Sequence, residues 1–391
     1  MTVTWEKFFP DWELYTPGVF PVHAITALAL GETKLGTGAH NSALKNRFLK
    51  AYNTKDTALL SKIGKVWSTG YNLTSIDEKT NPLLLVCNGA YQVTKVVKDQ
   101  TVTLKANPRY NSGRKTNGID TVVIKTISDA TAAAQALANK EADIFEVASA
   151  TGDSVAALKK ISGIVVDGVE QATYEHVEVR SGKMDGAKDY TGPFDGMTQK
   201  AKDLRTAFLL AYPRQEIVDK IVKLVNPKAV VMNSLQYFPG EPNYKKMIAA
   251  SGMDKFTDGT QAERTAKALA LVKKYYPSAA AGSGSVKVKI LWGQPTNARR
   301  SAQAALVKAE LAKAGFDATT TGTAGWPGFL DDSSFDAQFY AWSKTSLTQV
   351  GNFSSYKSTA SQTGYNNPKV DAIIEELEVE NLSEAERYAK Y

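Results

Sequence analysis

The chain has 391 residues, of which 43% are hydrophobic and 22% charged, so it has a globular composition and is too long for one core. No run approaches the ~20 consecutive apolar residues that span a bilayer, and residues 1–7 carry no export signal. The 47 Lys and Arg residues outnumber the 40 Asp and Glu residues by seven, but both signs are interspersed along the chain. Without a basic tract interleaved with aromatics, nucleic acid is not an expected partner.

The single cysteine, Cys87, excludes a disulfide within the chain. It ends the apolar run 83–87, which predicts a small buried hydrophobe. Such cysteine poverty is compatible with a reduced compartment and with a large exported protein, so it leaves the localisation open.

Strands and helices are predicted in mixed order in the first half of the chain. They are a strand over 3–8, helices over 43–52 and 57–63, a β-hairpin over 91–97 and 101–105, a strand over 121–127, a helix over 130–140 and a strand over 142–145. Asn41 or Ser42 is the expected N-cap of the first helix, and Ser128 or Asp129 that of the third.

The second half alternates more regularly, which predicts an α/β sheet with helices packed on it. Its predicted elements are a helix over 153–160, strands over 164–166 and 173–179, helices over 198–212, 214–224 and 261–274, a strand over 286–292, a helix over 298–314 and strands over 317–321 and 335–342. The glycine-rich segment 182–196 is an expected lobe boundary. The chain stops within a helical pattern at 383–388, which suggests truncation.

The residues needed for catalysis or for metal binding are sparse. Only His23, His40 and His176 are histidines, and the sequence has no His-Glu-x-x-His motif, no cysteine pair, no phosphate-binding glycine loop and no Gly-x-Ser-x-Gly elbow. The acidic pairs 331–332 and 375–376 are adjacent in sequence, so their side chains do not converge on a substrate. We expect no catalytic site, no metal and no cofactor.

Several segments in one order resemble the peptide and nickel class of ABC solute-binding proteins. They are Asn88-Gly89-Ala90-Tyr91-Gln92-Val93, Val102 to Tyr110, Ile127-Ser128-Asp129-Ala130, Ala142-Asp143-Ile144, Lys202 to Phe208, Pro213 to Val218, Ala309 to Phe316, Phe335-Asp336 with Tyr340-Ala341-Trp342, and Gly364 to Asp371. The form Tyr212-Pro213-Arg214-Gln215-Glu216 most resembles actinobacterial members, and residues 3–12 resemble the end of the family's second domain.

The resemblance implies a two-lobed, periplasmic-binding-protein-like α/β fold with mixed sheets, flanking helices, a hinge and part of an accessory domain. Residues 1–80 would be the remainder of the accessory domain and the crossover to lobe one, 81–190 part of lobe one, and 191–391 lobe two. It also implies that the start of the family chain, with its export signal and lipid-attachment cysteine, and the final return strand are missing.

The implied function is extracytoplasmic capture of oligopeptides or dipeptides for an ABC permease, by a monomeric lipid-anchored or periplasmic protein that is not an enzyme. Peptide ligands are held through main-chain hydrogen bonds, with their side chains in wet pockets. The candidate ligand-binding residues are Trp342, Tyr340, Ser343 and Thr345, then Tyr174, Glu175 and His176, then Trp292, Gln294 and Trp326.

Trp342 matches a tryptophan that lines the family's cleft. In peptide-binding relatives an aspartate three residues later pairs with the ligand's amino group, whereas this chain has Thr345. A neutral threonine cannot replace a charge-assisted hydrogen bond, so Glu175 is the nearest candidate anion, or the ligand is not a peptide. The open alternatives are a sugar, a metal chelate or a lipid head group as ligand, a cell-envelope regulator without transport, and a hydrolase.

Overall fold

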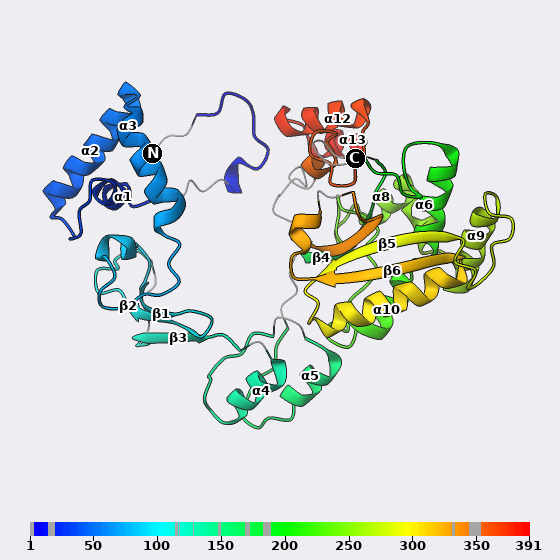
Figure 1. Ribbon diagram of the computed structural model, residues 1–391, viewed down its shortest axis with the longest axis horizontal. Helices are drawn as coiled ribbons and strands as arrows, with labels where there is room; N and C mark the ends of the chain where they lie inside the picture. Colours follow the sequence, from blue (N-terminus) through cyan, green and yellow to red (C-terminus); the bar gives the residue numbers. More distant parts are fainter. Residues whose placement is uncertain are drawn as a thin grey trace. The chain divides into compact units, whose positions relative to one another are not determined.

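The computed structural model describes residues 4–14, 20–113, 116, 118–127, 129–147, 150–168, 173–182, 189–330, 333–343 and 353–391. The chain divides into two compact units, one of residues 16–135 and one of residues 1–15 and 136–391. We call them the small unit and the large unit. Figure 1 shows the elements of each.

The small unit begins with three helices, α1 (Val22–Ala29), α2 (Gly38–Thr54) and α3 (Thr57–Lys65), and a π-helical turn, Val66–Gly70, continues α3. The Thr37 hydroxyl accepts a hydrogen bond from the His40 amide, so α2 begins one turn earlier than predicted and the expected cap at Asn41 or Ser42 was wrong. The Asp56 carboxylate caps α3 in the same way, by accepting from the Leu59 amide at 3.1 Å.

A three-stranded antiparallel sheet, β1 (Tyr91–Val97), β2 (Thr101–Ala106) and β3 (Thr121–Lys125), completes the small unit. The predicted hairpin is therefore confirmed. A bridge between Ile76 and Val96 joins the segment after the helices to β1. The helices and this sheet belong to the same unit. The assignment of the three predicted segments to lobes stays a prediction.

Cys87 is exposed, so its prediction as a buried hydrophobe was wrong. The apolar run containing it bends into a 3₁₀ helix, Pro82–Leu85, which buries Leu83 and leaves the cysteine beyond its end. The Asn81 side chain accepts from the Leu83 amide and starts this turn.

The large unit contains a four-stranded sheet of β4 (Thr173–Val179), β7 (Ala337–Ser343), β5 (Val286–Gly293) and β6 (Phe316–Thr323), in that order. Strands β7, β5 and β6 are parallel and β4 is antiparallel to β7. Helices α6 (Gln199–Ala211), α9 (Gln261–Lys273) and α10 (Ala298–Lys313) pack through one continuous apolar core on one face of this sheet. Figure 1 shows α10 running along β5 and β6. This is the predicted α/β arrangement.

The large unit has further helices and single helical turns. They are a 3₁₀ turn (Trp12–Leu14), α4 (Ala130–Ala138, which starts in the small unit), α5 (Gly152–Leu158), α7 (Arg214–Ile217) with a π turn (Val218–Val222), α8 (Tyr244–Ser251), 3₁₀ turns at Met253–Phe256, Trp326–Phe329 and Ser354–Tyr356, α12 (Pro368–Val379) and α13 (Glu384–Lys390). None of the described helices is both long enough and apolar enough to cross a bilayer.

Two predicted strands are irregular segments instead, 142–145 and 164–166, and the described part of 3–8 is not a strand either. Ile144 is 88% exposed and Val165 is 91% exposed. A short apolar run becomes a strand only when a neighbouring strand satisfies its backbone groups, and these runs have no such neighbour among the described residues.

Candidate functional site

The residues that the sequence singles out on β4 and β7 face one another across the strand pair. Tyr174 lies opposite Trp342, and His176 lies opposite Tyr340. Because side chains alternate along a strand, these four project from one face of the sheet, the face turned away from the helix-packed core. Together with Trp326 we call them the aromatic strip.

Ring contacts hold the aromatic strip together. The Tyr340 ring centroid lies 4.7 Å from His176, 5.2 Å from Trp326 and 5.6 Å from Trp342. Tyr174 contacts His176 at 5.3 Å. Tyr340 is 1% exposed and Trp342 is 41% exposed, so the strip runs from a fixed, buried ring to an accessible indole at the end of β7. A large apolar ring with one N–H donor in this setting suits a partly polar, planar ligand group.

Trp326 reaches the strip because Gly293, at the end of β5, has no side chain. A Cβ at this position would lie 2.3 Å from the Trp326 ring. The glycine therefore allows the ring to lie directly against the backbone of β5 and beside Tyr340. Phe238, 6.1 Å from the Tyr174 ring, adds an aromatic wall that sequence reasoning missed.

The buried end of the strip is polar. Glu178 and Gln338 form the next cross-strand pair, and the Gln338 amide donates to the Glu178 carboxylate at 2.9 Å. His176 Nε2 lies 3.3 Å from the same carboxylate, and the Tyr340 hydroxyl donates to Gln362 at 2.6 Å. Two further buried atoms, His176 Nδ1 and Gln338 Oε1, have no hydrogen-bond partner among the described residues.

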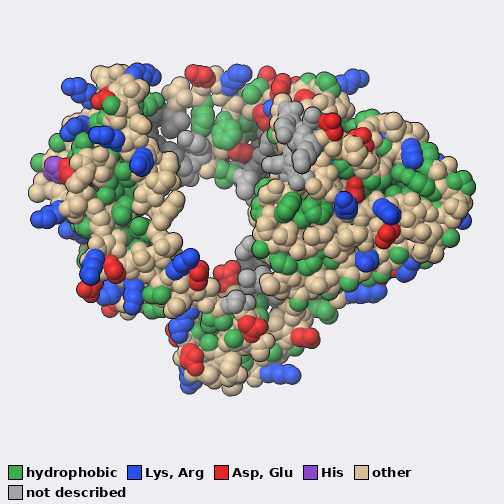
Figure 2. Space-filling model, viewed as in Figure 1, with side chains coloured by type: hydrophobic (Ala, Val, Ile, Leu, Met, Phe, Trp, Pro, Cys, Tyr) green, Lys and Arg blue, Asp and Glu red, His purple; other side chains and the backbone are tan. Residues whose placement is uncertain are grey.

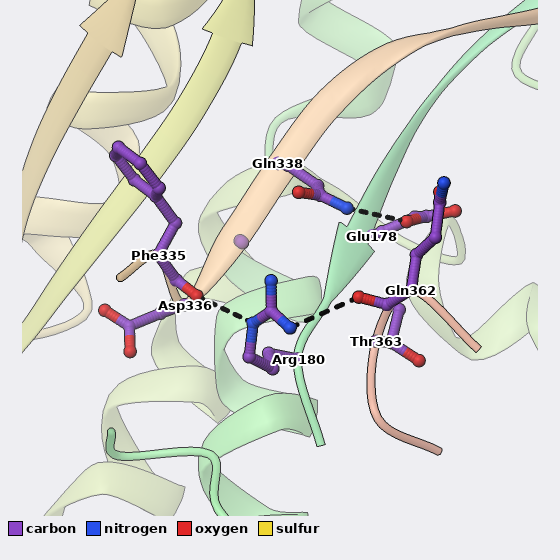
Figure 3. Close-up of a pocket in the computed structure, with 8 residues that line it drawn as sticks. Glu178, Arg180, Phe335, Asp336, Gln338, Gln362 and Thr363 are labelled. Atoms are coloured by element: carbon purple, nitrogen blue, oxygen red, sulfur yellow. Dashed lines mark hydrogen bonds between the residues drawn. The ribbon is translucent and has the colours of Figure 1, made fainter. Parts of the chain in front are cut away.

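A shallow depression, too tight to admit a water molecule, adjoins this polar end, and Figure 3 shows the residues lining it. Arg180, 3% exposed, projects into it and donates to the carbonyl oxygens of Phe335 (3.0 Å), Gln362 (3.3 Å) and Leu330 (3.3 Å). Asp336 accepts from the Tyr190 hydroxyl at 2.7 Å and from a backbone amide of β5. Arg180 thus ties two loops to the end of β4, which gives the depression a structural role.

Two titratable side chains at the strip, Glu178 and Tyr174, have shifted pKa values. Burial alone would raise the pKa of Glu178, but hydrogen bonds and charge from His176, with the Gln338 hydrogen bond, outweigh it and lower that pKa. Burial raises the pKa of Tyr174, and the negative charge of Glu178 raises it further. Glu178 is therefore an ionised acceptor already engaged by neighbours, and Tyr174 remains a neutral donor at pH 7.

Glu175 projects from the opposite face of β4. Its two carboxylate oxygens accept from Arg299 at 2.6 Å and from Arg300 at 3.0 Å, both on the first turn of α10. The Trp292 ring lies on this face too, stacked 6.1 Å from Phe339 and 8% exposed. The structure thus separates Glu175 and Trp292 from the aromatic strip.

The other predicted residues lie near the strip's ends or outside the described residues. Gln294 is exposed in the turn after β5, where its backbone has a positive φ of 60° and its side chain accepts from Asn297. Ser343 ends β7 and hydrogen-bonds to Thr173 at 2.9 Å. Thr345 lies outside the described residues.

Residues 41–364 match the model of the bacterial extracellular solute-binding proteins, family 5, middle region. The chain belongs to this family. The family 5 proteins are solute-binding proteins rather than enzymes, and their name places them outside the cytoplasm. No curated protein sequence matches the chain.

Solved structures of similar fold include the periplasmic EDTA-binding protein EppA, with a TM-score of 0.54, 19% identity, and coverage of 77% of this chain and 55% of that one. The Escherichia coli murein tripeptide binding protein MppA has a TM-score of 0.53 and 18% identity, with coverage of 80% and 57%. The substrate-binding domain of an oligopeptide ABC transporter from Bacillus anthracis has a TM-score of 0.53 and 17% identity, with coverage of 78% and 55%. The family 5 chain described here thus spans little more than half the length of these relatives.

Proposed function

We propose that the chain is the substrate-binding component of an ABC importer, which captures a small extended ligand, a peptide first of all, and presents it to a membrane permease. The observation that carries the proposal is the accessible Trp342 on a buried aromatic base, in a chain of the solute-binding family 5. The protein acts outside the cytoplasm as a lipid-anchored or periplasmic monomer.

The aromatic strip is the proposed contact surface for the ligand. Trp342 stacks on a peptide unit and its indole N–H donates one hydrogen bond, while Tyr174 supplies a neutral donor beside it. Ser343 ends β7 and is a further proposed contact, and Thr345, two residues later in the sequence, is proposed with it. Glu175 is assigned to the fold rather than to the ligand, because both of its oxygens are already paired with arginines.

Capture requires no chemistry on the ligand. A ligand shifts a two-lobed protein toward its closed form only if it makes contacts there that the open form lacks. We assign some of these contacts to the aromatic strip. If hydrogen bonds hold the peptide main chain and water-filled pockets hold its side chains, peptides of many sequences can bind. The aspartate that pairs with the peptide amino group in relatives is replaced by Thr345, so a charged ligand terminus would have to be recognised elsewhere.

The ligand class is open between a peptide and a chelate or other non-peptide, since the solved relatives include both a tripeptide-binding and an EDTA-binding protein. Native mass spectrometry of the protein purified without denaturation separates them. We expect a ladder of co-purified peptide masses that disappears on unfolding and refolding. A single non-peptide mass would assign another ligand, and turnover of an added peptide library would overturn the binding role altogether.

A further inference from the structure

The net positive charge of the protein comes from the small unit. Residues 16–135 contain 15 Lys and Arg against 7 Asp and Glu, a net charge of +8, whereas the remaining residues contain 32 against 33, a net charge of −1. The excess of basic residues therefore lies in one continuous stretch of the chain, which folds as one unit. A surface of one sign on one unit is a feature that attracts a partner of the opposite sign.

Within the small unit, the helical segment 22–70 has seven basic residues and two acidic ones. All seven basic side chains are exposed: Lys34, Lys45, Arg47, Lys50, Lys55, Lys62 and Lys65. Both carboxylates are engaged locally, Glu32 with His40 at 2.8 Å and Asp56 as the cap of α3. None of the seven basic groups forms an ion pair with another described residue. Figure 2 shows Lys and Arg side chains spread over this part of the surface.

Exposed apolar side chains lie among these charges. Lys45, Leu49 and Tyr52 are spaced i, i+4, i+7 on α2 and so form one stripe on its surface. Leu49 is 52% exposed and Tyr52 is 60% exposed, and Lys55 lies 6.0 Å over the Tyr52 ring. Near the start of α1 and the end of α3, Phe20 and Trp67 are half exposed and contact each other at 4.4 Å.

We propose that the helical segment 22–70 is a docking face for a bilayer surface that carries anionic phospholipids. Lysine side chains extend their charged groups toward phosphates while their stems lie along apolar surface. Leucine, tyrosine and tryptophan occupy the interfacial layer between headgroups and acyl chains. Each lysine near an anionic surface adds to the attraction, so the basic groups on the same side of the helices as the Lys45, Leu49 and Tyr52 stripe strengthen the contact.

The apolar residues distinguish a bilayer from a soluble polyanion such as nucleic acid. A polyanion is bound mainly through phosphate or carboxylate contacts, with affinity that falls steeply with salt. It gains little from exposed Leu49, whereas a bilayer buries that side chain. The face does not depend on the proposed ligand site, because the aromatic strip belongs to the other unit.

The test is sedimentation of the full chain with phosphatidylcholine vesicles, with and without phosphatidylglycerol. We expect binding only to the anionic vesicles, weakened by salt, and a loss of roughly 100-fold or more for the triple variant Lys45→Glu, Lys62→Glu, Lys65→Glu. The matched control reverses three exposed lysines of the large unit, Lys228→Glu, Lys245→Glu and Lys246→Glu, and should bind as the unchanged protein does.

A second variant, Leu49→Ser with Tyr52→Ser, retains every charge and removes two exposed apolar groups. We expect it to lose several-fold in vesicle binding while its binding to poly-glutamate is unchanged. Equal binding of both triple variants, or a Leu49/Tyr52 variant that binds vesicles normally, overturns the proposal. Ligand retention in native mass spectrometry should be intact in all of these variants, so a failed capture function would be recognised separately.

Discussion

Glu175 and Glu178 lie three residues apart on β4 and project from opposite faces of the sheet. Glu178 accepts from Gln338 and contacts His176 beneath the aromatic strip, while Glu175 binds two arginines of α10. Because side chains alternate along a strand, Glu178 lies on the face that carries the aromatic strip and Glu175 lies on the face covered by α10. Two carboxylates of one strand therefore have different roles.

The lowered pKa of Glu178 predicts a pH-dependent contribution to stability. A carboxyl whose pKa is lower in the folded state stabilises the fold above its unfolded pKa, and this contribution is lost as the pH falls through the folded pKa. We expect Glu178→Gln to reduce the free energy of unfolding at pH 7 by about 1–2 kcal/mol. Urea unfolding measured from pH 7 downward should show this difference shrinking below about pH 4.

The control for this prediction is Glu376→Gln, which removes a carboxylate whose side chain is 43% exposed and lies 2.6 Å from Lys390. Exposed ion pairs contribute about 0–1 kcal/mol, so its effect should be small at every pH. A Glu178→Gln loss that stayed constant down to acidic pH would show that the charge of Glu178 does not stabilise the fold.

At the scale of elements, the pairing of Glu175 with α10 fixes that helix against the edge strand of the sheet. Arg300 is nearly buried, with 7% of its side chain exposed. Removal of its partner leaves an uncompensated buried charge, so Glu175→Gln should cost about 3 kcal/mol of unfolding free energy. Asp219→Asn, which breaks the exposed pair with Lys223, should cost less than about 1 kcal/mol.

The Glu175→Gln variant also tests whether Glu175 contacts the ligand. In buffer where Glu175→Gln protein is still folded, we expect it to retain the ligand masses seen for the unchanged protein. A folded Glu175→Gln variant that has lost its ligand would instead support the sequence-based hypothesis that Glu175 replaces the missing aspartate.

The sequence predicted those elements that are specified by residues close to one another in the chain. The β1–β2 hairpin follows from two alternating runs and a short turn, and β5, α10 and β6 from a regular β-α-β order. The pairing of β4 with β7 brings together segments far apart in the chain, so the sequence could nominate Tyr174 and Trp342 but not place them opposite each other. Glu178 and Gln338 could have been found by extending the same alternation. Phe238 and Gln362 could not, because loops bring them to the strip.

At the scale of the whole molecule, two surfaces in two units divide the proposed tasks. The large unit holds the aromatic strip, and the carboxylate beside it, Glu178, already accepts hydrogen bonds from its neighbours. The small unit holds the seven exposed basic groups of the helical segment 22–70, which form no ion pair with any described residue. The excess of basic residues over 16–135 can be counted in the sequence, but only the structure shows that this stretch folds as one unit.

Equilibrium dialysis against a mixed-sequence peptide library, read by mass spectrometry, tests the account most directly. The comparison is between the unchanged protein, Trp342→Ala and Trp67→Ala, which removes a tryptophan of similar exposure from the small unit. We predict that Trp342→Ala weakens peptide retention by roughly tenfold or more and that Trp67→Ala leaves it unchanged. Equal retention by all three proteins would contradict the assignment of the aromatic strip as the ligand-binding surface.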